Sequence, residues 1–202
     1  MTAITTVPAA RRASLEARLL AFLVDSVVLL SFTLVFWAVA GLQLLIASDF
    51  GKKTDPPEWS YYAVLAIVMA VIPLWLAFNV ALCRWRGQTV GKYVADIRVV
   101  REDGRPLGLW RSLARFLLLH PLLFHIFLVP NWLLTTAIVT SLTVSAAVLV
   151  VTLTITFLSV FAIFLATGSV LLDGRHRALH DRVAGTTVVP AGSPERSPQP
   201  AA

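Results

Sequence analysis

The chain has 202 residues, of which 57% are hydrophobic and 14% are charged, and its formal net charge is +6. Soluble proteins carry about 25% charged residues on average, so this composition excludes an ordinary soluble domain and indicates a multi-pass membrane protein. Because basic residues of membrane proteins gather in cytoplasmic loops, we expect the lipid bilayer as a partner and no nucleic acid. Cys83 is the only cysteine, which excludes an internal disulfide and a zinc site of several thiolates.

The first long apolar run predicts a membrane span over about residues 19–46, after a disordered N-terminus at 1–10. This run exceeds the roughly 7 to 15 apolar residues of a cleaved signal peptide, so we expect it to be retained. A second span is predicted over about 61–83. It begins at Trp59, Tyr61 and Tyr62, aromatic residues that are typical of the membrane interface.

Asp25 is the only charged residue between Arg18 and Asp49. Seven residues of helix place Arg18 and Asp25 on one face, about 10.5 Å apart along the axis. A charged side chain inside a membrane costs about 2.5 to 3.5 kcal/mol on insertion scales unless a partner offsets it. The sequence therefore predicts that polar groups from other helices gather around Asp25.

Residues 84–115 hold eight of the seventeen Lys and Arg residues, which indicates a cytoplasmic segment. Its stretch 87–92 lacks the spacing of a phosphate-binding loop and is interpreted as a tight turn at the membrane surface. We call the residues Gly87, Thr89, Gly91 and Lys92 the motif turn. Alternating polarity predicts a strand over 94–100, which we expect to pair with a strand over 185–189.

Residues 116–172 contain no Asp, Glu, Lys or Arg. As one helix they would reach about 85 Å, nearly three times the thickness of a hydrocarbon core, so they should form two spans. We predict these spans over about 113–135 and 143–172, with a turn within 130–142, followed by a disordered tail at 190–202.

The expected fold class is an all-α membrane protein, a four-helix transmembrane bundle with both termini cytoplasmic and a small cytoplasmic strand pair. Of the basic residues, three precede the first span, eight lie between the second and third, four follow the fourth, and two lie in the loop after the first. The positive-inside rule then places both termini inside the cell.

Polar residues recur at a similar depth below the inner membrane surface. Helix rise places Asp25 about 9 to 10 Å past Arg18, Asn79 about 7 Å from Arg84, and His120 about 7 Å past Arg115. We therefore predict a polar layer around Asp25, with Arg18, Arg111 or Arg115 reaching toward it. A structural clamp between helices explains such a layer as well as a transport role does.

Histidines at two places in the sequence could have a chemical role. His176 and His180 are four residues apart, but no further His or Cys lies nearby, so an ordinary amphipathic turn is favoured over a metal site. His125 is interpreted as a packed or hydrogen-bonded histidine, with a proton relay as the alternative. Motifs of hydrolases, metalloproteases and nucleotide-binding enzymes are absent from the sequence, so we expect no enzyme, metal or cofactor.

Several motifs in order resemble the RDD family of membrane proteins: Arg18-x-x-Ala21-x-x-x-Asp25, the stretch GQTVGK at 87–92, IRVVREDGRPL at 97–107, and Leu179-His180-Asp181 with Ala184-Gly185-Thr186. The resemblance covers about residues 11–189, a single RDD-type transmembrane domain. It implies that Arg18, Asp25 and Asp181 are the arginine and two aspartates of the family name. It also implies a mostly bacterial family, and so a multi-pass protein of the bacterial inner membrane.

The resemblance implies two classes of function, since some members are linked to cation/proton antiport and others look like accessory subunits. The first expectation is transport of a small cation or solute, coupled to protons and carried out by a homo-oligomer. The alternative is a non-catalytic scaffold that assembles with a membrane-protein partner. The candidate functional residues, beyond the motif turn, are Arg18, Asp25, Asn79, Arg111, Arg115, His120 and Asp181.

Overall fold

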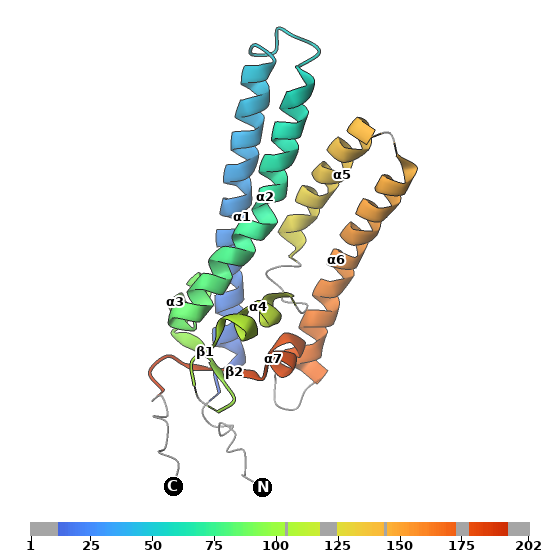
Figure 1. Cartoon of the computed structure of the whole chain (residues 1–202). Helices are drawn as coiled ribbons and strands as arrows, with labels where there is room; N and C mark the ends of the chain where they lie inside the picture. Colours follow the sequence, from blue (N-terminus) through green and yellow to red (C-terminus); the bar gives the residue numbers. More distant parts are fainter. Residues whose placement is uncertain (1–11, 104, 118–124, 144, 173–177, 194–202) are drawn as a thin grey trace.

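The computed structural model describes residues 12–103, 105–117, 125–143, 145–172 and 178–193. The described chain is mostly helical and carries one small antiparallel sheet at one end of two long helices (Figure 1). His120, His176 and the two predicted disordered ends, apart from residues 190–193, lie outside the described residues. Residues 190–193 are ordered, because Pro190 ends a strand and the backbone N–H of Ala191 donates to Asp96 O at 2.9 Å, so disorder was wrong there.

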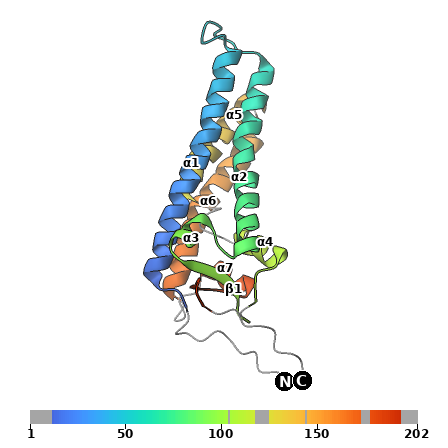
Figure 2. The same cartoon turned by 90° about the vertical axis from the view of Figure 1, so that its left-hand side faces the viewer.

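The two long helices are α1 (Leu15–Ala47) and α2 (Glu58–Arg86), which run antiparallel side by side (Figures 1 and 2). Both are long and apolar enough to cross a membrane, as predicted for 19–46 and 61–83. Ser14 caps α1, since its side chain accepts a hydrogen bond from Ala17 N at 3.2 Å. At 1.5 Å per residue α1 is about 50 Å long, so its ends extend beyond a hydrocarbon core of about 30 Å.

Apolar side chains hold the two helices and their neighbours together in layers. Leu29 of α1 packs with Val71 and Trp75 of α2 and with Leu128, and all four are at most 2% exposed. Toward the far end Ala40 packs with Val64 and Val68. Small and branched side chains at the contact allow close helix packing where lipid supplies no hydrophobic driving force.

The third predicted span, 113–135, is wrong as a single helix. Its described parts belong to α4 (Leu109–Leu117), the short 3-10 helix η2 (Ile126–Leu128) and α5 (Val129–Thr143), with His125 extended at φ −93° and ψ 145°. Pro130 lies in the first turn of α5, where a proline is well tolerated because no intrahelical N–H bond is lost. The proline therefore marks a helix start, although it lies within the interval 130–142 in which we predicted a turn.

The turn between the last two apolar helices lies just after the predicted interval of 130–142. Helix α5 continues to Thr143, and α6 (Ala146–Leu172) begins three residues later. Ser145 stabilises the new start, since its side chain accepts a hydrogen bond from Val148 N at 3.5 Å. Helices α5 and α6 pack against each other as a hairpin beside α1 and α2 (Figure 1).

The predicted strand pair is confirmed, but its first strand begins later than the predicted residue 94, because Val94 ends a short helix. Strand β1 (Ile97–Arg101) pairs antiparallel with β2 (Thr186–Pro190), with Ile97 opposite Pro190 and Arg101 opposite Thr186. Two short helices flank the sheet, α3 (Val90–Val94) before β1 and α7 (Leu179–Ala184) before β2. Ala13 N donates to Val188 O at 2.9 Å, so both ends of the described chain meet at this sheet.

Candidate functional site

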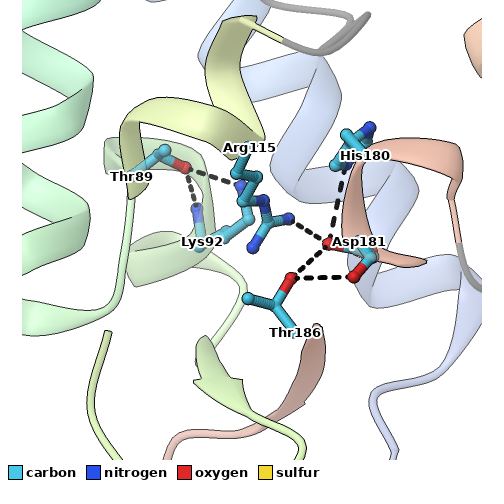
Figure 3. Close-up of polar contacts among 6 residues, drawn as sticks. All are labelled: Thr89, Lys92, Arg115, His180, Asp181 and Thr186. Atoms are coloured by element: carbon cyan, nitrogen blue, oxygen red, sulfur yellow. Dashed lines mark hydrogen bonds and ion pairs between the residues drawn. The ribbon is translucent and has the colours of Figure 1, made fainter. Parts of the chain in front are cut away.

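Six buried polar side chains gather where the short elements cover the end of the two long helices. We call them the polar cluster; none is more than 8% exposed. Asp25 comes from α1, Thr89 and Lys92 from the start of α3, Arg115 from α4, Asp181 from α7 and Thr186 from β2. Figure 3 shows five of these residues, with His180 beside them. Phe22 of α1 packs against the group formed by Val80, Cys83 and Phe116, so Asp25, three residues further along α1, lies near the last turns of α2.

The motif turn holds Asp25 by two hydrogen bonds. Oδ1 of Asp25 accepts from the backbone N–H of Gly91 at 2.7 Å, and Oδ2 of Asp25 accepts from the Thr89 hydroxyl at 2.5 Å. Thr89 is also the N-cap of α3, since its Oγ1 accepts from Lys92 N at 3.4 Å. The stretch 87–92, which we interpreted as a tight turn, therefore binds the buried carboxylate of Asp25.

Two glycines allow the motif turn to adopt this arrangement. A Cβ on Gly91 would lie 1.9 Å from the carbonyl oxygen of Ala21 and 2.8 Å from Asp25 Cγ, so only glycine lets α3 approach α1 this closely. Gly87 ends α2 with φ +67°, a left-handed conformation that favours glycine, and a Cβ there would lie 2.8 Å from Val99 O. Both glycines of the motif turn are thus required by backbone contacts.

Lys92 is joined to Asp25 through the Thr89 hydroxyl. Its Nζ donates to Thr89 Oγ1 at 3.2 Å, while the hydrogen of that hydroxyl is directed at Asp25 (Figure 3 shows Thr89 and Lys92). Among the described residues no carboxylate oxygen lies within 4.0 Å of Lys92 Nζ. The amine, the hydroxyl and the carboxylate form a buried three-membered chain.

Arg115, one of the three arginines that we expected near Asp25, pairs with the other aspartate. Arg115 Nη2 lies 2.9 Å from Asp181 Oδ1, and both side chains are at most 3% exposed. The Thr186 hydroxyl donates to the same Oδ1 at 3.2 Å, so one carboxylate joins α4, α7 and β2 (Figure 3). Among the described residues Nε and Nη1 of Arg115 have no hydrogen-bond partner.

Charge and burial act in opposite directions on Asp181. Burial by itself raises the pKa of a carboxyl group, but the positive charge of Arg115, helped by Arg18 and Lys92, outweighs it and holds the pKa of Asp181 below its usual value. The neighbouring His180 is 5% exposed, and burial lowers its pKa to about 3. Its ring is therefore neutral near pH 7, and its 3.7 Å approach to Asp181 is not an ion pair.

The other predicted site residues lie apart from these hydrogen bonds. Asn79 is 1% exposed, and its Nδ2 donates to Trp75 O of its own helix at 2.9 Å, while its Oδ1 has no partner within the described parts of the chain. Arg111 is exposed and lies beside Gly185. Arg18 contributes positive charge at Asp181, and His120 lies outside the described residues.

Two buried polar contacts were not predicted as parts of a site. His125 Nδ1 accepts from Phe127 N at 3.2 Å, so the neutral ring carries its proton on Nε2, which lies 2.9 Å from Ser26 Oγ. This agrees with the reading of His125 as a hydrogen-bonded histidine. Asn131 accepts from Trp37 Nε1 at 3.2 Å and donates to Val68 O at 3.4 Å, joining three helices. The polarity of Asn131 within the charge-free run is a signal that could have indicated this contact, but the residue lies in the interval 130–142 in which we predicted a turn.

No group of three or more His, Cys, Asp or Glu side chains that could hold a metal ion is found among the described residues.

A family model described as the RDD family matches residues 12–185 of the chain. No curated protein and no solved structure shows a significant match.

Proposed function

The chain belongs to the RDD family and is a membrane protein, and from this premise we propose that it exchanges protons for a small cation or solute across a bacterial inner membrane. The observation that carries the proposal is the buried chain from Lys92 through Thr89 to Asp25. Its two ends are groups that can each hold or release a proton.

The geometry of Thr89 suits proton transfer between these ends. Its hydroxyl accepts from the amine and donates to the carboxylate, so a shift of hydrogens along the chain changes the charge at both ends together. Burial disfavours the charged amine, and no carboxylate touches it directly among the described residues. Lys92 therefore gives up its proton at a smaller cost than an exposed lysine would.

The balance of buried charge couples loss of the Lys92 proton to binding of a cation at Asp25 in this proposal. The polar cluster holds two cationic side chains, Lys92 and Arg115, and two carboxylates, Asp25 and Asp181. A cation can replace the lysine as the counter-ion of Asp25 without leaving excess buried charge only when Lys92 is deprotonated. Exchange of a proton for a cation follows from this balance. In our proposal a second copy of the chain completes the pathway.

We further propose that both termini and the polar cluster face the cytoplasm. The loop between α1 and α2 carries Lys52 and Lys53, whereas the other end of α2 carries Arg84 and Arg86 and leads into the basic segment 84–115. The positive-inside rule supports this orientation.

Flux measured in proteoliposomes with an imposed pH gradient tests the proposal. Wild-type protein should move Na⁺ or K⁺ in the direction opposite to protons, and Asp25→Asn and Lys92→Gln should abolish this flux. Thr89→Ser should keep it, since the hydroxyl remains. Asp55→Asn, in the exposed loop after α1, is the matched control. Undiminished flux in correctly folded Asp25→Asn and Lys92→Gln would overturn the proposal.

A second candidate function is a non-catalytic scaffold. The observation that favours it is the contact of Asp181 with both Arg115 and Thr186, by an ion pair and a hydrogen bond. These contacts hold α4, α7 and β2 together at the end of the bundle. A scaffold predicts a partner that co-purifies at constant stoichiometry and is lost when residues 84–115 are replaced, together with no flux in the pure protein.

A further inference from the structure

Helix α4 is amphipathic and lies across the end of α2. One face is buried: Ser112, Arg115 and Phe116 are at most 2% exposed. Phe116 packs against Val80 and Cys83 in the last turns of α2, which places α4 crosswise at that level (Figures 1 and 2).

The opposite face of α4 is apolar and open. Trp110 is 78% exposed and Leu117 is 50% exposed, and Leu109 beside them is 43% exposed. Such a helix, apolar on one side and without a protein neighbour there among the described residues, is typical of segments that lie in the plane of a membrane interface.

The aromatic residues of α2 place α4 at the depth of the lipid headgroups. Trp85 is two residues past Cys83 and is 78% exposed, and Trp59 at the other end of α2 is 59% exposed. Their separation of 26 positions corresponds to about 39 Å of helix, close to the roughly 40 Å that separates the two polar surfaces of a bilayer. Exposed tryptophans at this spacing are typical of the two interfaces.

The two segments that lie beside and within α4 are basic and contain no acidic residue. Arg84, Arg86 and Arg111 are exposed, and neither 84–95 nor 105–117 contains an Asp or Glu. Guanidinium groups form paired hydrogen bonds with phosphate oxygens, and basic residues near the cytoplasmic leaflet attract anionic lipids. The partner that complements both the apolar and the cationic side chains is therefore an anionic phospholipid.

We propose that α4 lies in the cytoplasmic interface of the membrane, with Trp110 and Leu117 among the acyl chains and with Arg84, Arg86 and Arg111 on the headgroups of anionic phospholipids. Arg115 projects from the buried face of the same helix into its ion pair with Asp181. Lipid that holds α4 in place therefore also stabilises the polar cluster. This inference does not depend on transport.

Two measurements on the full chain test it. In nanodiscs of phosphatidylcholine, addition of 30 mol% phosphatidylglycerol should raise the thermal midpoint of the wild type, and the combined variant Arg84→Gln, Arg86→Gln, Arg111→Gln should lose at least half of that rise. The matched control Lys52→Gln, Lys53→Gln changes exposed cations at the other end of α2 and should keep the full rise. An equal rise in the arginine variant would overturn the proposal.

Depth is measured with a spin label. Trp110→Cys can be labelled selectively, because the native Cys83 is 1% exposed. Its collision rates with lipid-soluble oxygen and a water-soluble nickel chelate should place the label among the upper acyl-chain carbons, just below the headgroups, whereas a label introduced by Asp103→Cys in the β1 turn should report water. A Trp110 label as accessible to the chelate as the Asp103 label would overturn the proposal and would leave this face for a soluble protein partner.

Discussion

Replacing Gly91 with alanine should detach the motif turn from Asp25. The new Cβ would lie 1.9 Å from Ala21 O, whereas carbon–oxygen contacts are comfortable at about 3.3 Å, so α3 must retreat by about 1.4 Å. That movement would stretch the 2.7 Å bond between Gly91 N and Asp25 to about 4.1 Å, beyond hydrogen-bond range. The bond from Thr89, two residues away on the same turn, should be lost with it.

The energetic cost follows from these two bonds. Hydrogen bonds to a charged group contribute about 1.5 to 3 kcal/mol each, so their loss should lower the free energy of unfolding by about 3 to 6 kcal/mol. We expect this loss in denaturant titrations of the purified protein in detergent, followed by tryptophan fluorescence.

Gly41→Ala is the matched control. Gly41 lies inside α1, and a Cβ there would meet nothing within 4 Å, so the substitution should stabilise the helix by up to about 1 kcal/mol. The reasoning would be refuted if Gly91→Ala cost less than about 1 kcal/mol, or if both variants changed stability alike.

Two further predictions concern the Asp181 end of the cluster. Arg115→Met should cost about 3 to 5 kcal/mol by leaving a buried carboxylate unpaired, and Arg115→Met with Asp181→Leu should recover part of that loss in a double-mutant cycle; additive losses would contradict the pairing. Because the folded chain holds the pKa of His180 at about 3 and an unfolded histidine titrates near 6.5, the unfolded state binds the extra proton between these values. Stability should therefore be full above pH 6.5 and fall by up to about 1.4 kcal/mol per pH unit below it, more steeply than in His180→Gln; equal slopes would contradict the assignment.

The sequence alone determined the elements whose signals are local. Long apolar runs predicted the larger part of α1 and α2 and all of α6, because a segment that fills a bilayer must satisfy its backbone hydrogen bonds within one helix. Alternating polarity predicted the strands of the small sheet, and their pairing was correct. Local signals failed in the charge-free run, where an apolar stretch has no charges to mark its turns and Pro130 suits a helix start as well as a turn.

Tertiary structure decided which polar groups meet. The sequence identified Asp25, Thr89, Gly91, Lys92, Arg115 and Asp181 as candidates. It did not predict that Thr89 and Gly91 hold Asp25 across separations of 64 and 66 residues, or that Arg115 pairs with Asp181. Helical spacing tells which face of a helix a side chain occupies, but its neighbour on that face depends on which distant segment of the chain packs there. Here the return of α3 against α1 requires the missing side chain of Gly91, a contact visible only once the two backbones are placed together.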